Sequence, residues 1–487
     1  MLFTEPTFLF LFLPVLLALY FAPASRTHGR YGNWLLLVAS VIFYAKGGGS
    51  FTWLMLASIA FNYFMAILVA ARRSQGWLAL AIGANLTVLG VFKYANFFAD
   101  NINTLFLVIG ARPLVVPRVL LPIGISFFTF HAISYVVDVY RRDATAQKSP
   151  VHAALYLLLF PQLIAGPIIR YRDIADQLAL RRVTVDDLAC GIRRFVIGLA
   201  KKVLIANVVA GPADQIFAMP FAQLSIRHAW LGLVCYTLQI YFDFSGYSDM
   251  AIGLGRMFGF RFPENFRWPY VADTVQEFWR RWHISLSTWF RDYLYVPLGG
   301  NRVPPSRMYR NLVMVFFICG LWHGASWNFV IWGLWHGTFL VIERVLGWRS
   351  ARAQDPAAPS LTPAHRAAGH VYALSVVMVG WVIFRAETLA GSLAFLRALA
   401  GLSPALTTPY TVSWYFTPEV ALALAAGAIG SMPWVPALAA RIQSAPHRPG
   451  IAWTIPALNT TALALLLLAS IMQMAARTYN PFIYFRF

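Results

Sequence analysis

Two histidines in apolar surroundings are the residues of this sequence best suited to chemistry. His283 ends the run WRRWH, residues 279–283, and His323 lies in GLWHG, residues 320–324, at the end of an apolar block. An ionisable side chain is costly at membrane depth, so a histidine there is a candidate functional residue. Its ordinary pKa of about 6.5 suits the removal of a hydroxyl proton at neutral pH. A hydrogen-bonded structural imidazole is the alternative interpretation of each.

The pentapeptide GLWHG occurs twice, and its sequence does not show which copy is catalytic. The second copy, residues 333–337, places His336 thirteen residues after His323. On one continuous helix that offset spans about 20 Å and turns the two side chains to different faces. We therefore expect the two histidines not to share a site, unless Gly324 breaks the helix. His131, in a similar apolar context, is predicted to be a core histidine with its hydrogen bonds satisfied.

Other catalytic chemistries find less support. A catalytic zinc needs three His, Cys or carboxylate ligands, often with HExxH spacing, and this spacing is missing, so we expect no metal. The three cysteines have no CxxC spacing and predict neither a disulfide framework nor a zinc site. Ser245 lacks the first glycine of a GxSxG elbow, so we do not expect it to be a catalytic nucleophile. Asp243 and Asp249 flank this serine and could orient a catalytic histidine, but helix capping and pairing with nearby arginines are the simpler roles.

The elements that must position these residues are membrane helices. Of 487 residues, 59% are hydrophobic and 12% are charged, against about 25% charged in a soluble domain. Apolar blocks approach the roughly 20 residues that cross a bilayer, so we predict an all-α polytopic membrane protein with about ten to thirteen membrane helices. The first block lacks a basic flank and a cleavage site and predicts a retained span. The blocks are 8–21, 34–45, 51–71, 77–92, 119–139, 153–169, 195–210, 230–241, 312–321, 327–346, 371–384, 420–429 and 462–474.

The net charge of +20, from 39 Lys and Arg against 19 Asp and Glu, would suggest nucleic acid in a soluble chain. Here the basic residues fall between apolar blocks, as the positive-inside rule requires, so we expect a lipid bilayer and no nucleic acid as partner. Residues 170–202 are predicted to be cytoplasmic. The excess is concentrated there and in residues 256–310, the stretch that contains His283.

The interval 243–311 is too polar to span lipid and too aromatic for an ordinary loop. Thr274 and Glu277 have capping-box spacing, and Pro297 with the glycines after it would stop a helix. This predicts one interfacial or re-entrant helix, on one face of which lie Trp279, His283, Leu286 and Phe290. Residues 349–369, rich in Ala, Pro and small polar residues, are predicted to form a loop.

Three long motifs resemble the membrane-bound O-acyltransferase (MBOAT) family. They are YFDFSGYSDMAIG at 241–253, EFWRRWHISLS at 277–287 and LWHG at 321–324. The similarity is greatest to the bacterial branch that includes the alginate O-acetylation membrane subunit and the teichoic-acid D-alanylation membrane protein. Shorter matches are LPIGISFF at 121–128, IAGP at 164–167 and GGNR at 299–302, so the resemblance covers most of residues 1–344.

The resemblance implies one membrane domain over residues 1–487, in which a ring of helices surrounds a central funnel or tunnel. Its motif-rich core would be residues 119–346, followed by the loop and by C-terminal helices over 370–487. The family's invariant histidine maps onto His323, which would act as general base on the acceptor hydroxyl. The second motif histidine maps onto His283, which would orient or polarise a reactant.

The activity implied is acyl transfer across the bacterial inner membrane. The donor would be acetyl-CoA, used as a co-substrate and not held as a permanent cofactor. Because guanidinium groups bind phosphate bidentately, Arg280 and Arg281 beside His283 are candidates to hold its phosphates. The final acceptor would be an exported polysaccharide such as alginate, served by a periplasmic polysaccharide acetyltransferase partner.

Two alternatives stay open. In one, the fold is kept but the donor is a D-alanyl or other acyl thioester on a carrier protein. In the other, the histidines form a proton relay in a proton-coupled transporter. A transporter predicts inverted repeats and broken midplane helices, and the sequence contains no such halves, but only the short GLWHG doublet. The sequence does not identify the acceptor polymer.

Overall fold

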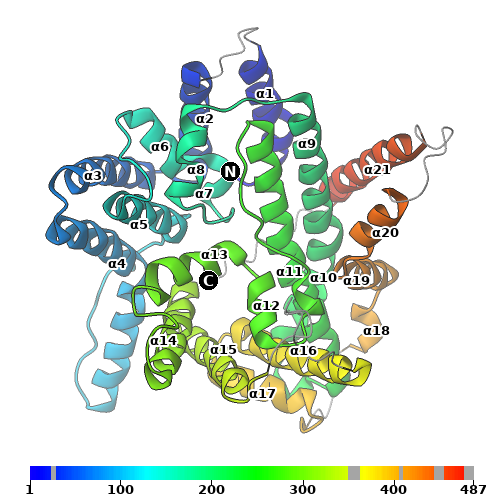
Figure 1. Ribbon diagram of the computed structural model, residues 1–487. Coiled ribbons are helices and arrows are strands. Elements are labelled where there is room, and N and C mark those ends of the chain that lie inside the picture. Colours follow the sequence, from blue (N-terminus) through cyan, green and yellow to red (C-terminus); the bar gives the residue numbers. More distant parts are fainter. Residues whose placement is uncertain (23–28, 349–361, 405–409, 444–453, 477–487) are drawn as a thin grey trace. The chain divides into compact units, whose positions relative to one another are not determined.

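The computed structural model consists of helices joined by turns, with no strand among the residues that it describes (Figure 1). These are residues 1–22, 29–348, 362–404, 410–443 and 454–476. They divide into two compact units, one of residues 1–195 with 250–263 and the other of residues 196–249 with 264–487. The all-α prediction is confirmed for this part of the chain.

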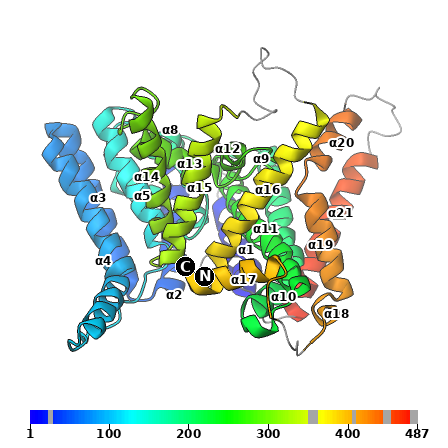
Figure 2. The same ribbon diagram turned by 90° about the horizontal axis from the view of Figure 1, so that it is seen from below.

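The first unit is a set of helices in which α3, α4 and α5 lie side by side (Figure 2). The buried amides of Asn62 on α3 and Asn85 on α4 bond each other, at 2.8 and 3.1 Å, which fixes the register of two otherwise apolar helices. Its helices are η1 (Phe8–Phe12), α1 (Leu13–Phe21), α2 (Gly29–Gly48), α3 (Phe51–Arg72), α4 (Gln75–Val108), α5 (Ile125–Arg141), α6 (Pro150–Leu158), α7 (Phe160–Leu163), α8 (Tyr171–Ala179) and most of α9 (Val185–Ala200).

The second unit contains both candidate histidines. It begins at the end of α9 and includes most of α11 (Ile226–Met257), whose last turns belong to the first unit. Its other helices are η2 (Lys201–Ala206), α10 (Asn207–Phe217), η3 (Phe221–Gln223), η4 (Pro269–Val271), α12 (Val275–Arg281), α13 (Ile284–Phe290), η5 (Arg291–Tyr295), α14 (Pro305–His323), α15 (Trp327–Val345), α16 (Pro363–Arg385), α17 (Leu389–Leu399), α18 (Val412–Tyr415), α19 (Pro418–Gly430), α20 (Trp434–Gln443) and α21 (Thr454–Ala476).

Five described helical segments are long and apolar enough to cross a membrane, namely Phe51–Arg72, Gln75–Val108, Val185–Phe217, Pro363–Arg385 and Pro456–Ala476. Large apolar side chains are exposed on them, such as Trp53 at 77% and Phe64 at 61%, as expected of surfaces that face lipid tails. The chain is thus a polytopic helical membrane protein. The figure of ten to thirteen membrane helices stays a prediction.

Three predicted boundaries are wrong. The block 153–169 is not one helix, because Pro161 has no N–H to continue α6, and the chain restarts as the short α7. The block predicted to end at Tyr241 continues as α11 to Met257, into the interval predicted to be non-spanning. The C-terminal part of the predicted loop 349–369 is the first turns of α16, and residues 349–361 lie outside the described part of the chain.

Lys201 and Lys202 are not loop cations, contrary to the topology argument. Both lie in η2, inside the Val185–Phe217 segment. Lys202 is 2% exposed and pairs with the equally buried Asp243, and Lys201 Nζ is 2.6 Å from Asp249 Oδ2. The aspartates therefore have the predicted structural role, but their partners are lysines and not arginines. A buried pair of this kind persists because each charge compensates the desolvation of the other.

The GLWHG doublet has a packing function in the α14–α15 hairpin. A Cβ added at Gly320 would lie 2.3 Å from the carbonyl oxygen of Phe329 and 3.3 Å from the Cα of Gly333. The first glycine of each copy thus faces the other, which lets the two backbones touch, as small residues do in membrane helix pairs. Figure 2 shows the two helices side by side, joined by the turn at residues 324–326.

Candidate functional site

The helix predicted to carry both Trp279 and His283 is broken between them. α12 ends at Arg281, and His283 has φ +44° and ψ +53°, in the left-handed region, before α13 begins. A residue other than glycine there costs about 1–2 kcal/mol. Such strain persists where the surroundings enforce it and is concentrated at functional sites. The prediction of one continuous helical face is therefore wrong, and the break falls on the candidate histidine.

Side chains that lie outside α12 hold its N-terminus. The Thr274 side chain accepts a hydrogen bond from the Glu277 backbone N–H at 3.0 Å, as its spacing predicts. Glu277 does not complete the capping box, because its carboxylate pairs with Arg281. Instead the buried carboxylate of Glu343 on α15 accepts from the N–H groups of Val275 at 2.5 Å and Gln276 at 2.9 Å. A negative charge at this end of a helix is favourable, so α12 is fixed against α15.

Asn265 holds the N-terminus of α13 in the same way. Its backbone carbonyl accepts from the Ile284 N–H at 2.9 Å. Its side-chain Oδ1 accepts from the Ser285 N–H at 3.3 Å and from the Ser285 Oγ at 2.9 Å. Its Nδ2 donates to Ser248 Oγ on α11 at 2.7 Å. Asn265 is fully buried, so this network ties the loop, α11 and α13 together without access to water.

The same amide fixes the tautomer of His283. The Nδ1 of His283 is 3.1 Å from Asn265 Oδ1. Because that oxygen already accepts from the backbone N–H of Ser285, it is an acceptor, and Nδ1 must donate. The Nε2 therefore carries the lone pair, and this buried atom has no hydrogen-bond partner among the described residues. Burial also lowers the pKa of His283 to about 3, so the ring is neutral at physiological pH.

The indole of Trp322 brings His283 and His323 together. Its ring centroid is 6.3 Å from that of His283 and 4.8 Å from that of His323. His323 is the last residue of α14 and is half-buried, with Trp332 and Phe384 at ring distances of 4.9 and 5.3 Å. The two predicted catalytic residues therefore belong to one aromatic cluster of the second unit.

His336 belongs to the same cluster, contrary to the expectation from a continuous helix. The turn after His323 folds α15 back on α14, so the offset of thirteen residues no longer separates the two side chains along one axis. The ring of Trp332 contacts both, at 4.9 Å from His323 and 5.3 Å from His336. His336 is fully buried, and neither ring nitrogen has a partner within the described ranges.

The two candidate arginines differ in their environment. Arg281 Nε lies 2.7 Å from Glu277 Oε1, and its Nη1 donates to the Arg267 carbonyl at 3.0 Å. Arg280 is 57% exposed, with a weak 3.8 Å contact to the same carboxylate. Arg281 is therefore engaged in holding α12, and Arg280 is the more available cation.

The remaining candidates have structural surroundings. His131 is fully buried and accepts from the Ile169 N–H at Nε2, at 3.2 Å, but its Nδ1 has no partner in the described part of the chain, so the prediction of full satisfaction is half right. Ser245 is buried in the middle of α11. No group of three His, Cys, Asp or Glu among the described residues could hold a metal ion.

Sequence reasoning missed Asn265 and Glu343. Neither has a motif of its own, and they act on helices 20 and 68 residues away through hydrogen bonds that only folding creates. A short helix begins with backbone N–H groups that residues elsewhere in the chain must satisfy. This need for partners at α12 and α13 is the signal that could have pointed to such residues.

These features define a polytopic helical membrane protein whose candidate site is a pair of histidines set among aromatic rings. A family model described as "MBOAT, membrane-bound O-acyltransferase family" matches residues 50–383. The chain belongs to this family and is an O-acyltransferase. The resemblance carried by the sequence motifs is thereby confirmed.

Two relatives that are similar over their full length carry the same name. The probable alginate O-acetylase AlgI of Azotobacter vinelandii is 44% identical and that of Pseudomonas aeruginosa is 42% identical, each with all of both chains covered. The peptidoglycan O-acetyltransferase of Helicobacter pylori is 37% identical over 83% of this chain and 80% of its own. These relatives are bacterial.

Proposed function

We propose that this protein transfers acetyl groups from acetyl-CoA towards an exported polysaccharide of the alginate type. The full-length relatives carry the name of alginate O-acetylase, and the peptidoglycan relative is also named for acetyl transfer. A teichoic acid D-alanyltransferase of Bacillus subtilis is 31% identical over only 43% of this chain. The names thus favour acetyl over D-alanyl as the group transferred, and membership of the family favours a ring of helices around a funnel as the fold.

In the proposed reaction His323 is the general base. The acceptor hydroxyl oxygen attacks the thioester carbonyl carbon while His323 removes the hydroxyl proton. The carbon–sulfur bond then breaks, and the thiolate leaves with the proton that His323 returns. Trp332 packs on His323, and its buried Nε1 has no partner among the described residues, so it is a donor available to the developing oxyanion.

His283 is the second group that would touch a reactant. The observation that carries this assignment is its unpartnered Nε2 lone pair, fixed by Asn265 and placed across Trp322 from His323. A neutral imidazole in this tautomer accepts a hydrogen bond from a second hydroxyl of the acceptor and so orients the attacking hydroxyl, whose own proton goes to His323. Asn265 is then a positioning residue, which acts through His283.

The arrangement of basic residues supports delivery of the donor from the cytoplasm. The Arg344 Nη2 donates to Asn301 Oδ1 at 3.1 Å, so the end of α15 lies beside the start of α14, where Arg302, Arg307 and Arg310 cluster. The positive-inside rule assigns this end to the cytoplasm. Thirteen residues of α14 separate Arg310 from His323, about 20 Å along the axis. The thioester must therefore enter well below the basic surface, with Arg280 the better placed of the two arginines to meet phosphate.

Incubation of the purified protein with acetyl-CoA labelled in the acetyl group tests the proposal. We expect label transfer to an oligosaccharide acceptor, or to a periplasmic transferase partner, and its loss by at least 10³-fold in His323→Ala, as for removal of a catalytic base. His336→Ala is the matched control, because it removes a buried imidazole from the same hairpin. Transfer from a carrier-protein thioester but not from acetyl-CoA would overturn the donor assignment, and full activity in His323→Ala would overturn the base.

A further inference from the structure

The C-terminal part of α4 extends away from the rest of the first unit. The buried residues of α4 form one stripe at four-residue spacing, which ends at Lys93, and none of residues 94–108 is buried. Figures 1 and 2 both show this end of the helix, in light blue, projecting beyond α3 and α5. The segment after the helix runs back beside it. We call residues 96–121 the arm.

The arm is a hairpin with a defined structure. Gly110, at φ +72°, reverses the chain after the helix. The side chain of Asn103 donates to the Leu114 carbonyl at 3.0 Å and accepts from the Leu114 N–H at 2.7 Å. Asn96 does the same for Val119, at 2.8 and 3.0 Å. The returning segment is therefore fixed along the helix, so little ordering is needed when another molecule binds it.

The arm lies outside the hydrocarbon core of the membrane. α4 has 34 residues and is about 51 Å long. Even at a tilt of about 40° it would rise about 39 Å, against about 30 Å for the core. Because α4 begins just after Arg72 and Arg73, which mark one membrane surface, the excess length is at the end that carries the arm. The backbone N–H groups of Val115 and Val116 have no partner within the described ranges, and such groups do not occur exposed to lipid tails.

The arm is on the side of the membrane opposite the cytoplasm. Pairs of arginines lie at the end of α3, residues 72–73, and at the end of α5, residues 141–142. Tyr140 of α5 and Trp77 at the start of α4 pack against the same buried cluster, so both pairs lie at the same end of the unit. The positive-inside rule assigns that end to the cytoplasm, and the arm is at the other end of α4.

Large apolar side chains cover the arm although lipid tails do not reach it. Val115 is fully exposed and Val108 is 79% exposed. Contiguous apolar patches that are exposed outside the membrane mark interaction sites between proteins. The arm therefore has the character of a protein-docking surface. Its main exposed apolar side chains are Phe98, Leu105, Leu107, Val108, Val115 and Leu120.

The charges of the arm favour a different protein over a second copy of this chain. Arg112 is exposed and forms no ion pair with any residue that the structure describes. Asp100 is the only carboxylate of the arm, and Arg118 Nη1 already lies 2.8 Å from its Oδ2. An identical arm thus offers no uncompensated carboxylate to Arg112, whereas a protein with an acidic group beside an apolar face does.

We propose that the arm is the docking surface for a second protein on the side opposite the cytoplasm, one with an apolar face bordered by carboxylates. Under the proposed function, on which this inference rests, that protein is the periplasmic transferase partner. Its apolar face covers Val108 and Val115, and one of its carboxylates pairs with Arg112. The rigid arm thereby holds the partner at the membrane.

Photo-crosslinking of the full chain in cells that export the polysaccharide tests this docking. Benzoylphenylalanine replaces Val115 on the arm or, as a control, Phe64, which is 61% exposed in the middle of α3. We expect one protein adduct from position 115, identified by mass spectrometry as a protein with a periplasmic domain, and none from position 64. Because Val115 is fully exposed, its replacement should leave the amount of the chain in the membrane unchanged.

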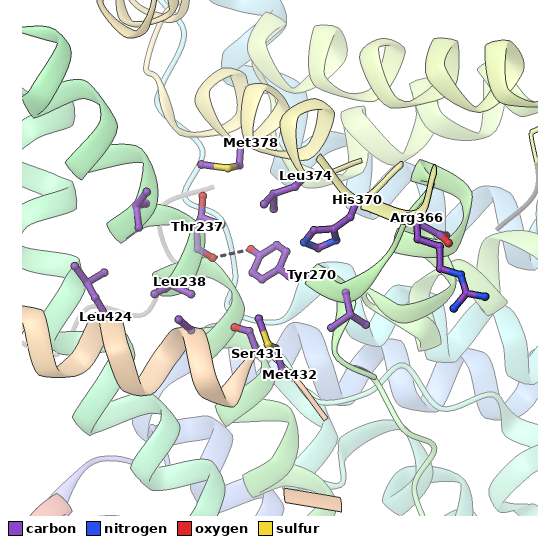
Figure 3. A pocket seen from close by; sticks show the side chains of 14 residues that line it. Thr237, Leu238, Tyr270, Arg366, His370, Leu374, Met378, Leu424, Ser431 and Met432 are labelled. Carbon is purple, nitrogen blue, oxygen red and sulfur yellow. Dashed lines mark hydrogen bonds between the residues drawn. The ribbon is translucent and has the colours of Figure 1, made fainter. Parts of the chain in front are cut away.

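A binding measurement with purified proteins then tests the contact itself. The protein identified in the adduct is purified, and its Kd for the full chain in detergent is measured. Arg112→Glu should raise this Kd about tenfold, or about 1.4 kcal/mol, because it replaces attraction to a carboxylate by repulsion. Arg366→Glu is the charge control and should leave the Kd unchanged. Arg366 is also exposed, forms no ion pair with a described residue, and lies at the edge of a cavity of about 660 Å³ in the second unit (Figure 3).

Five results would overturn the proposal. They are an adduct between two copies of this chain, an adduct with lipid alone, an adduct with a protein that lacks a periplasmic domain, no adduct from position 115, and an unchanged Kd in Arg112→Glu. Adduct formation requires no turnover, so its yield should be the same in His323→Ala. A failure of docking is therefore distinct from a failure of the acetyl-transfer assignment.

Discussion

Replacement of Asn265 by alanine is the sharpest test of how this site is built. The variant removes the acceptor for His283 Nδ1 at 3.1 Å and for the Ser285 N–H and hydroxyl at 3.3 and 2.9 Å, and it removes the donor to Ser248 at 2.7 Å. All four residues are at most 4% exposed, so water cannot replace these bonds. An unsatisfied buried polar group costs about 1–3 kcal/mol. With partial relaxation, we expect a loss of about 2–4 kcal/mol in the free energy of unfolding.

The same variant should also lower catalysis in the molecules that remain folded. Without the amide, His283 is free to adopt the other tautomer and to leave its strained left-handed conformation, so its Nε2 lone pair is no longer fixed. Loss of the hydrogen-bond partner that orients a metal-bound imidazole costs about 10- to 100-fold in affinity or activity. We expect a fall of this size in kcat for label transfer from acetyl-CoA, measured per folded protein, with KM for the donor little changed because Asn265 does not touch it.

Two further variants separate positioning from simple destabilisation. Asn265→Asp keeps oxygen acceptors for His283 and Ser285, so it should retain activity within about tenfold of the wild type. Asn62→Ala removes an equally buried amide network in the first unit and should lower thermal stability without lowering kcat per folded protein. The reasoning is refuted if Asn265→Ala turns over at the wild-type rate, or if Asn265→Asp is as impaired as Asn265→Ala.

The buried ion pair and the helix hairpin give two further predictions. Lys202→Met should destabilise the protein by about 3–5 kcal/mol because Asp243 keeps an uncompensated charge, and the double variant with Asp243→Leu should recover most of the loss. A lower melting temperature for the double variant than for the single one would contradict this. Gly320→Ala should cost about 1–3 kcal/mol, since its Cβ would clash with the Phe329 carbonyl, whereas Gly83→Ala, with open space around it, should not lower the melting temperature in detergent.

The sequence predicted the class of the protein and its two main candidate residues. Low charge and long apolar blocks require helices in lipid, because backbone polar groups there must be satisfied within the helix. The long motifs around His283 and His323 indicated the acyltransferase family, since their residue types and spacing form a pattern too long to arise by chance. These features are local in the chain, so they can be read without knowledge of the fold.

The surroundings of those residues were decided by the tertiary structure. The break at His283 depends on Asn265 and Glu343, which reach their helices through hydrogen bonds between distant segments. The nearness of His336 to the His323 cluster depends on a hairpin closed by two glycines in contact. Lys202 lies in a basic run of the kind expected in a loop, but its position beside Asp243 makes it part of the core. A linear pattern gives residue types and spacing, whereas burial, tautomer and charge pairing depend on which segments fold against each other.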